Sequence, residues 1–496
     1  MIHQRIILLL LLAGLTLQYC TVQKERSPGY YEEPWRPGFH FSPEAHWMND
    51  PNGLVYYNGK YHLFYQYYPD STVWGPMHWG HAESTDLLHW QHLPIALYPD
   101  SLGWIFSGSA VIDQNNTAGF GPNAMVAIFT YHNDEIWKAG RKNTESQGIA
   151  YSLDEGKTWT KYKGNPVLNN SGEQDFRDPK VFWNTILARW TLTLAAGDRI
   201  KIYSSADLKS WQLDSEFIPP VREEYGVWEC PDLFPLKAGD EEKWVMIVSQ
   251  NKNGPNGGSA TRYFIGNFDG KTFTPITSSQ WFDYGMDFYA AVTFGNVPDG
   301  KRILQGWMSN WEYATRTPTT VWRSAMNLPR ELQLVKEGDS YALRQAIPGQ
   351  FQSLTSPLFT AKEAGELPKS GLPLSSSLIE FEIPDTTNSF DLSLSNSAGE
   401  ILSIACRDNQ LQIDRGKSGK VDFSPEFARQ VQVMPLTDPV RRLQLIVDQS
   451  SVEVVVNDGT HWMTCQVFPT QPYETINSTK PSVIRNLKVW KVQRTW

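Results

Sequence analysis

Cysteine is scarce in this chain of 496 residues, which contains Cys20, Cys230, Cys406 and Cys465 and no other cysteine. An odd number remains once Cys20 is set aside, and no two form a CxxC pair, so neither a disulfide framework nor a zinc site is predicted. Cys406 and Cys465 could pair if their strands are neighbours, which the sequence leaves open. The hydrophobic core is therefore expected to hold the fold unaided.

An excess of positive charge is also lacking. The chain has 44 Lys and Arg against 53 Asp and Glu, which gives a formal net charge of −9. Proteins that bind nucleic acid usually carry a basic excess, so a nucleic-acid partner is disfavoured. Hydrophobic residues make up 41% and charged residues only 20%, which excludes a disordered chain and indicates a globular protein.

Long apolar runs are confined to the first twenty residues. Arg5 precedes the run Ile6–Leu15, which is too short to cross a bilayer and is typical of a secretion signal over residues 1–20. Cys20 lies where a bacterial lipoprotein carries its lipid. Leu17 fits that pattern, whereas Gln18 and Tyr19 replace its small residues, so a lipid anchor at Cys20 and ordinary cleavage both remain open. Either route predicts export to the bacterial periplasm or cell surface, and the lipid anchor would make the protein an outer-membrane lipoprotein.

No helical periodicity of 3.6 residues is sustained anywhere; a short motif recurs instead. Ser84–Trp90 returns as Ser205–Trp211 and, with one extra residue, as Ser152–Trp159, and a weaker echo is Phe268–Phe273. Each is a polar turn closed by an aromatic residue. Short β-rich runs precede these turns at 61–66, 125–130 and 244–249. The repeating unit is therefore a small antiparallel sheet.

A second repeat marks where each unit begins. Similar strand starts at positions 50, 107, 178, 229 and 287 are separated by 57, 71, 51 and 58 residues. This spacing predicts a five-bladed β-propeller over residues 36–345. The first strand of each blade lines the axis of a propeller, so these five positions are expected to converge on one funnel.

The pattern changes after the fifth unit. Residues 346–373 are rich in Pro, Gly, Ser and Thr and are predicted to form a linker or irregular entry. Residues 374–496 contain strands with two-residue alternation and hairpin turns, which predicts a β-sandwich. The predicted fold is thus all-β, a propeller followed by a sandwich. We expect the sandwich to act as a packing partner, with a carbohydrate platform as the alternative.

Three of the carboxylates at these convergent positions are the candidates for chemistry: Asp50, Asp178 and Glu229. Hydrolysis of an acetal needs a proton donor for the leaving oxygen and negative charge against the oxocarbenium ion, which two carboxyl groups supply. A separation of about 5–5.5 Å would predict retention of configuration. A third carboxylate could bind ring hydroxyls. Tryptophans that could stack on a neutral sugar are Trp47, Trp74, Trp79, Trp104 and Trp311.

Three motifs around these carboxylates resemble the signatures of glycoside hydrolase family 32, the fructan hydrolases and invertases. They are Trp47–Gly53, Phe176–Pro179 and Glu229–Pro231. Further matches are Tyr65–Gln66, Trp79–His81, Phe106–Ser109 and Pro329–Leu332. The similarity covers nearly the whole chain after the signal, and it also implies a propeller followed by a sandwich.

The resemblance implies a role for each matching residue. Asp50 would be the nucleophile, Glu229 the general acid and base, and Asp178 the stabiliser of the transition state. Five further residues would bind substrate: Asn49, Gln66, Trp74, Ser107 and Arg177. No cofactor is implied. No metal site is predicted either, because His78 and His81 would point to opposite faces of a strand.

The implied activity is retaining hydrolysis of β-D-fructofuranosyl linkages in levan or inulin, with sucrose as a further candidate substrate. Action at chain ends is the first hypothesis. Endo action that releases oligosaccharides is the alternative, since loop geometry decides it. A non-catalytic fructan-binding surface protein is a hypothesis of another class. We expect a raised pKa for Glu229 and a packing role for Cys230, and Arg177 could form a structural ion pair with Asp178.

Overall fold

The computed structural model describes residues 31–219, 226–384, 389–428 and 431–496. The predicted signal at residues 1–20, with Cys20, lies outside this range. Strands dominate the described residues, in which the helices are short. None of the helices in these ranges combines the length and apolarity needed to cross a membrane. The all-β prediction is confirmed.

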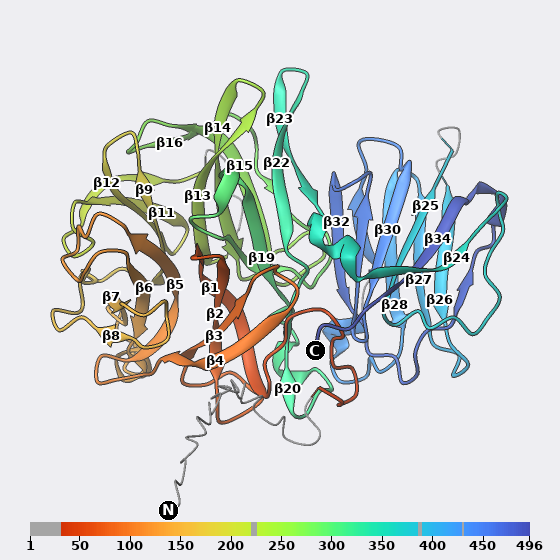
Figure 1. The fold of residues 1–496 in the computed structure, drawn as a ribbon, viewed down its shortest axis with the longest axis horizontal. Helices are drawn as coiled ribbons and strands as arrows, with labels where there is room; N and C mark the ends of the chain where they lie inside the picture. The colour runs from red at the N-terminus through yellow and green to blue at the C-terminus, as the bar shows by residue number, and fades with distance from the viewer. Residues whose placement is uncertain (1–30, 220–225, 385–388, 429–430) are drawn as a thin grey trace, which may run out of the picture.

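Five antiparallel sheets follow one another from residue 46 to residue 346 (Figure 1). The first contains β1 (His46–Tyr57), β2 (Lys60–Tyr68), β3 (His78–Ser84) and β4 (Trp90–Leu97), with β20 (Trp322–Arg323) parallel to β1. The second contains β5 (Trp104–Asp113), β6 (Ala124–His132), β7 (Glu145–Ser152) and β8 (Thr160–Lys161), with α1 (Asp134–Lys138) between β6 and β7. The third contains β9 (Phe176–Asn184), β10 (Arg189–Ala196), β11 (Arg199–Ser205) and β12 (Gln212–Phe217).

The last two sheets contain additional short strands. The fourth contains β13 (Trp228–Ala238), β14 (Glu241–Gln250), β15 (Ala260–Phe268), β16 (Phe273–Pro275) and β17 (Gln280–Trp281). The fifth contains β18 (Tyr289–Thr293), β19 (Arg302–Met308), β22 (Arg330–Glu337) and β23 (Ser340–Ala346), with β21 (Ala325–Met326) beside β19. Short 3-10 turns are η1 (Pro298–Gly300), η2 (Ala314–Arg316), η3 (Gly349–Leu354) and η4 (Pro481–Val483).

The five sheets close into a ring. Strand β1 contacts β5, β5 contacts β9, β9 contacts β13, β13 contacts β18, and β18 returns to β1. These are the first strands of the five sheets, so they surround one axis, as the spacing of the sequence repeats predicts. The five sheets within residues 46–346 therefore form a five-bladed propeller.

The repeated Ser-Asp-Trp motif closes three blades in the same way. It connects the third strand of a blade to its outermost strand. In the first blade, Asp86 Oδ1 accepts hydrogen bonds from Leu88 N and His89 N, at 2.9 and 2.8 Å, and Trp90 Nε1 donates to Leu87 O at 3.0 Å. Asp207 and Trp211 repeat these contacts in the third blade. The motif is thus a structural turn, because its side chains satisfy the turn's own backbone.

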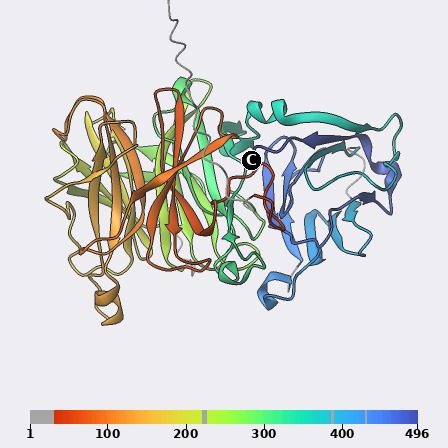
Figure 2. The same ribbon diagram turned by 60° about the horizontal axis from the view of Figure 1, so that its bottom comes forward.

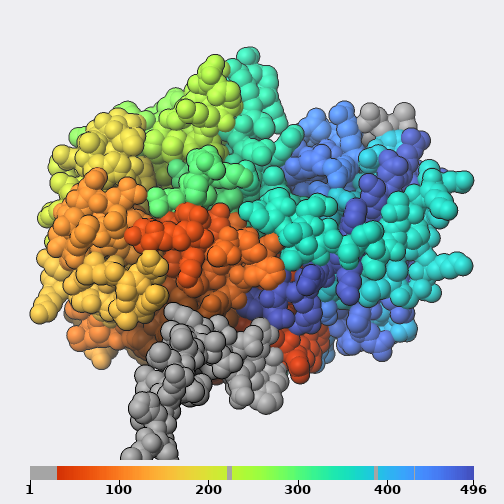
Figure 3. Space-filling model, viewed as in Figure 1, coloured from red at the N-terminus to blue at the C-terminus, as the bar shows by residue number. Residues whose placement is uncertain are grey.

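Two further sheets pack into a sandwich beside the propeller (Figures 1 and 3). One has the order β24 (Thr355–Thr360), β34 (Arg485–Val492), β25 (Ser377–Glu382), β30 (Arg442–Val447), β31 (Ser451–Val456) and β32 (His461–Gln466). The other has the order β29 (Gln432–Pro435), β28 (Gln410–Lys417), β27 (Ile401–Arg407), β26 (Phe390–Ser395) and β33 (Thr475–Asn477), with α2 (Pro425–Ala428) after β28. Their inward-facing side chains form one apolar cluster.

The segment predicted as a linker, 346–373, is only partly irregular. Its residues Thr355–Thr360 form β24, which pairs with β34 at the edge of the sandwich. An edge strand needs hydrogen bonds on one side only, which accommodates Pro357 and explains why the composition resembled a linker. Cys406 and Cys465 do not pair: both are buried free thiols.

Candidate active site

Each of the five first strands carries a β-bulge or irregularity near its N-terminal end, and we call this end of the strands the level of the site. The register shifts lie between Met48 and Pro51 in β1, between Phe106 and Gly108 in β5, and between Glu229 and Asp232 in β13. Strands β9 and β18 have matching shifts. A bulge leaves a residue unpaired and redirects its side chain, so every blade can present a group to the axis at this level.

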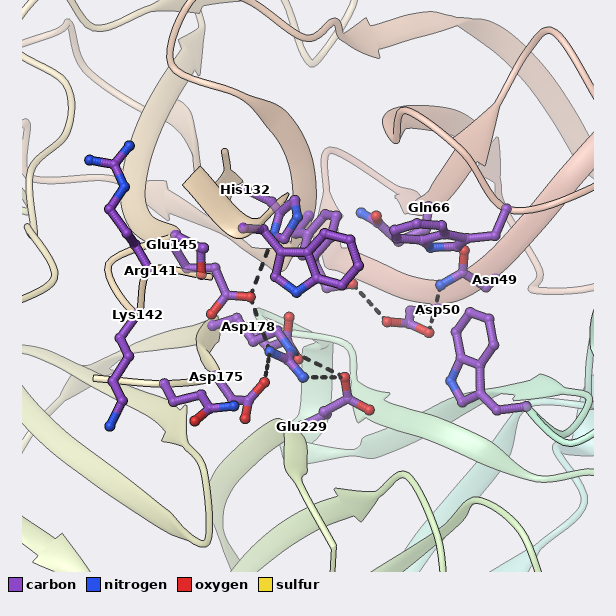
Figure 4. Close-up of a pocket in the computed structure, with 18 of the residues that line it drawn as sticks. Asn49, Asp50, Gln66, His132, Arg141, Lys142, Glu145, Asp175, Asp178 and Glu229 are labelled. Carbon is purple, nitrogen blue, oxygen red and sulfur yellow. Dashed lines mark hydrogen bonds and ion pairs between the residues drawn. The ribbon is translucent and has the colours of Figure 1, made fainter. Parts of the chain in front are cut away.

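Two of the predicted carboxylates, Asp50 and Asp178, lie within these register shifts, and the third, Glu229, lies directly before one. Asp50 comes from β1, Asp178 from β9 and Glu229 from β13, and all three line one cavity of about 470 Å³ (Figure 4). Asp178 has a positive φ of 65°, an unusual backbone conformation for a non-glycine residue and one found at functional sites. All five predicted substrate-binding residues line the same cavity: Asn49, Gln66, Trp74, Ser107 and Arg177.

Asp50 lies among hydrogen-bond donors. Asn49 Nδ2 donates to Asp50 Oδ1 at 2.9 Å, and Ser107 Oγ donates to Oδ2 at 2.8 Å. Asn49 is itself held by Trp47, whose Nε1 donates to Asn49 Oδ1 at 2.7 Å. Burial raises the pKa of Asp50, although the hydrogen bonds from Asn49 and Ser107 lower it. These donors fix the carboxylate in one orientation.

Glu229 is held by a guanidinium and a phenol. Arg177 Nε and Nη2 lie 3.1 and 3.0 Å from Glu229 Oε1, and the Tyr289 hydroxyl donates to Oε2. Burial raises the pKa of Glu229, as expected from the sequence, while Arg177 opposes the increase. The ion pair that the sequence suggested between Arg177 and Asp178 is not found among the described residues; Arg177 pairs with Glu229 instead.

Asp178 and Glu229 are coupled through their charges. Burial and then repulsion from Glu229 raise the pKa of Asp178 to about 8. Two carboxylates in one buried site cannot both ionise easily, so the pair holds its last proton more tightly than a free carboxyl group does. Such a shared proton is what general acid catalysis requires.

Cys230 lies between two of the carboxylates. Its backbone N–H donates to Asp178 Oδ2 at 3.0 Å, and its Sγ lies 3.6 Å from Asp50 Oδ2 and from Asp178 Oδ2. Burial and the adjacent carboxylates hold the thiol pKa well above its ordinary value, so the sulfur remains protonated. Cys230 is therefore a buried donor in the site as well as the packing residue expected from the sequence.

Two acidic residues that the sequence analysis missed hold Arg177 from its other side. Arg177 Nη1 donates to Glu145 Oε1 at 3.0 Å and to Asp175 Oδ1 at 2.8 Å. Glu145 Oε2 also accepts the Phe176 N–H at 2.6 Å. Burial would raise the pKa of Glu145, but Arg177 and these donors bring it below the ordinary value. Figure 4 shows this chain of contacts running from Glu145 to Glu229.

The candidate sugar platforms divide into two groups. Trp74, 39% exposed, and Trp311 line the cavity. Trp47 and Trp79 are fully buried, and their indole N–H groups bond within the protein. Trp104 supports Trp74 through an edge contact at 5.4 Å. Trp74 and Trp311 therefore remain available to a ligand.

The fifth predicted position, Asp287, does not join the funnel. It is buried against the sandwich, where Arg415 Nη1 lies 2.6 Å from its Oδ2. The fifth blade contributes Tyr289 instead, two residues further along at the start of β18. Asp287 matches the sequence pattern of the other strand starts, but its ion-pair partner, Arg415, lies in the sandwich.

The described ranges contain no group of three or more side chains arranged to hold a metal ion. The cavity instead brings together five carboxylates, two guanidiniums, one lysine and several aromatic faces. This arrangement suits acid and base chemistry on a neutral, hydroxyl-rich ligand.

Comparison with known sequences decides the family. The profile of the glycosyl hydrolases family 32 N-terminal domain matches residues 40–346, and that of the C-terminal domain matches residues 346–491. The chain belongs to glycosyl hydrolase family 32. It is therefore a glycosidase, and the expected family is confirmed.

Relatives within family 32 extend over almost the whole chain. A levanase of Bacillus subtilis is 41% identical over 99% of this chain and 76% of its own length. An extracellular exo-inulinase of Aspergillus niger is 39% identical over 89% of this chain and 90% of its own. The crystal structure of an exo-inulinase from Aspergillus awamori superimposes with a TM-score of 0.85 at 35% identity, covering 94% of this chain and all of that one. A β-fructofuranosidase from Schwanniomyces occidentalis, solved with fructosyl-erythritol, gives a TM-score of 0.81 at 32% identity, covering 94% of this chain and 99% of that one.

Proposed function

We propose that this glycosidase hydrolyses β-D-fructofuranosyl linkages in fructans such as levan or inulin, with sucrose as a possible further substrate. One observation carries the proposal: Asp50, Asp178 and Glu229 come from three separate blades and line one cavity. The levanase and exo-inulinases among its relatives support the substrate class. The cavity's hydroxyl-binding groups and exposed tryptophan suit the same neutral sugar.

In this proposal the reaction takes two steps with retention of configuration. The Asp50 carboxylate attacks the anomeric carbon of the terminal fructosyl unit, while Glu229 gives its proton to the leaving oxygen. Water then attacks the fructosyl–Asp50 intermediate, with Glu229 now acting as base, and fructose leaves. Asp178 binds hydroxyls of the fructosyl ring and stabilises the positive charge that develops on it.

The shared proton must reach Glu229 before the bond breaks. Arg177 and Tyr289 both donate to Glu229 and favour its charged form. Ring hydroxyls that donate to Asp178 would favour the charged form of Asp178 instead. Substrate binding would thereby move the proton of the pair to Glu229, where the leaving oxygen needs it.

Action at chain ends is the favoured mode. The exo-inulinases among the relatives support it. Product sizes test it: digestion of levan and inulin is expected to release fructose from the start. An early ladder of oligosaccharides would instead establish endo action.

Asp50→Asn tests the catalytic assignment. The variant keeps the size of the side chain and is expected to fold normally, but it loses the nucleophile. We expect kcat to fall by at least a hundredfold, which is about 3 kcal/mol or more of transition-state stabilisation. Reducing-sugar release from levan, inulin and sucrose measures this, and thermal melting checks the fold. Near-normal rates would reassign the nucleophile, and binding of fructan by the unaltered chain without sugar release would favour a non-catalytic binding protein.

Export is supported by the extracellular relatives. We propose in addition that Cys20 carries a lipid anchor, because Leu17 lies at the matching position of the lipoprotein pattern. Mass spectrometry of the mature N-terminus separates an acylated Cys20 from a simple cleavage product.

A further inference from the structure

A continuous series of aromatic rings extends along one side of the cavity, away from Asp50. We name Trp74, Phe106, His132 and Trp137, with Trp104 behind them, the aromatic wall. Ring centroids are 6.1 Å apart between Trp74 and Phe106, 4.3 Å between Phe106 and His132, and 6.3 Å between His132 and Trp137. All but Trp104 line the cavity.

Trp137 is the far end of this wall, and it is 60% exposed. It lies on α1, in the hairpin 133–144 between β6 and β7, which projects from the propeller in Figure 2. So large an exposed apolar surface at the mouth of a pocket is typical of a ligand-binding surface. Stacking on a sugar would bury it.

Contacts within the hairpin itself fix its shape. Asn133 Oδ1 accepts the Ile136 N–H at 3.0 Å and caps α1, while Lys138 lies 2.6 Å from Asp134. Asn133 N donates to Thr144 O at 2.8 Å and closes the base of the loop. A preformed loop loses little conformational freedom when it binds a ligand.

Two cations lie on the same hairpin. Arg141 and Lys142 line the cavity and are exposed, and neither side chain has an ion-pair partner within the described part of the chain. Figure 4 shows both at the end of the cavity opposite Asp50, Asn49 and Gln66, with the remaining carboxylates between the two ends. Their N–H groups can donate to several hydroxyls of a neutral sugar.

We propose that the hairpin 133–144 binds the fructan chain beyond the bond that is cleaved. This rests on the proposed function: the terminal fructosyl unit occupies the end near Asp50, and the leaving group passes Glu229. Trp137 stacks on a fructose unit of the leaving chain, and Arg141 and Lys142 donate to its hydroxyls. The hairpin therefore favours fructan chains over sucrose, whose leaving group is a single glucose.

Trp137→Ala tests the stacking contact, and Arg141→Ala combined with Lys142→Ala tests the cations. In both variants we expect the ratio of kcat/KM for inulin- and levan-type oligosaccharides to that for sucrose to fall about fivefold to tenfold. The loss is expected in KM more than in kcat, because the contact is made before and during the reaction alike. In the unaltered enzyme the same ratio should rise with oligosaccharide length.

Trp183→Ala is the matched control. Trp183 is also an exposed tryptophan, at 37%, but it lies at the opposite end of β9 from Arg177 and outside the catalytic cavity. We expect the ratio of kcat/KM for fructan oligosaccharides to that for sucrose to be the same in Trp183→Ala as in the unaltered enzyme. A direct readout is oligosaccharide binding by calorimetry to Asp50→Asn, with and without Trp137→Ala; the second change should weaken binding.

The possible results separate the two proposals. If the unaltered chain releases no sugar from fructan or sucrose, the proposed function fails. If fructan is hydrolysed but the ratio and the binding constant are unchanged in both hairpin variants, only the role of the hairpin fails. An equal loss on sucrose and on fructan would also overturn it, because that pattern indicates a general effect on the site.

Discussion

Arg177 forms ion pairs with acidic side chains on two sides. The charges around it determine how readily the catalytic carboxyl groups lose a proton. Glu145 and Asp175 hold it on one side and Glu229 on the other. Each negative charge beside the pair Asp178 and Glu229 makes it harder for that pair to lose its last proton. Glu145 is therefore a positioning residue that also tunes the proton of the catalytic pair.

Glu145→Gln removes one of those charges while its amide oxygen can still accept the Phe176 N–H. The pKa of the coupled pair should fall, because Arg177 acts on it more strongly and a repelling charge is gone. The reaction needs one proton on the pair, so activity is lost as pH rises through the raised pKa. We expect the basic limb of the kcat/KM profile to move about half a unit to one unit toward acid, at about 1.36 kcal/mol per unit.

A pH profile from pH 4 to 10 on one fructan measures this shift. Glu363→Gln, an exposed glutamate of the sandwich, is the control and should leave the profile in place. A uniform drop in activity with an unmoved basic limb would show that Glu145 acts only on structure.

At the scale of elements, the repeated Ser-Asp-Trp turn stabilises the blade, whereas the first strand of the blade carries the residues of the site. The turn closes the blade at its outer edge, where Asp207 Oδ1 accepts the N–H groups of Lys209 and Ser210 at 2.9 and 2.8 Å. These hydrogen bonds favour the charged form and lower the pKa of Asp207, although partial burial opposes this. The turn therefore contributes to stability and not to the chemistry.

Asp207→Ala should lower the free energy of unfolding by about 1–3 kcal/mol, because two backbone donors lose a charged acceptor. Urea denaturation followed by fluorescence measures the change, and the kcat of the folded variant should match that of the unaltered enzyme. Asp240→Ala, an exposed residue in the β13–β14 turn, is expected to change stability by less than about 0.5 kcal/mol. Equal effects of the two substitutions would contradict the assignment.

The sequence predicts the blades well because turns and strand alternation are local signals. The carboxylates 50, 178 and 229 were found because each lies in its own motif. The contact of Tyr289 with the site depends on how β18 pairs with β19, and the ion pair of Asp287 with Arg415 joins residues 128 positions apart. Neither the place of Tyr289 in the site nor this ion pair can be recognised from a local sequence pattern. Glu145 has no motif around it, and β24 was obscured by its turn-like composition.

At the scale of the whole molecule, buried charges join the sandwich to the propeller and to the N-terminal segment. Arg330 of β22 lies 2.7 Å from Asp283 and 3.3 Å from Glu453 of β31. His40 lies 2.8 Å from Asp448 and 3.0 Å from Glu453. All five side chains are fully buried, so each charge depends on its partners.

This network should make stability depend on pH in a defined window. Burial lowers the pKa of His40, but hydrogen bonds and charge from Asp448 and Glu453 outweigh it and raise the pKa to about 9. A raised pKa contributes stability that is complete below the unfolded value near 6.5 and is lost as pH rises through 9. Burial would raise the pKa of Asp448 and Glu453, yet His40 and further donors lower it, so their contribution is lost as pH falls through the depressed values.

His40→Gln removes the cation and leaves two buried carboxylates short of a partner. We expect the free energy of unfolding at pH 6 to fall by about 3–5 kcal/mol, the usual cost of breaking a buried pair from one side. The difference from the unaltered protein should shrink as pH rises from 6.5 through 9, because the unaltered protein then loses the same charge. Thermal melting across pH 5–10 measures this, with His89→Gln, half-exposed in a surface turn, as the control. A difference in melting temperature that stays constant over this range would show that His40 is buried without its charge.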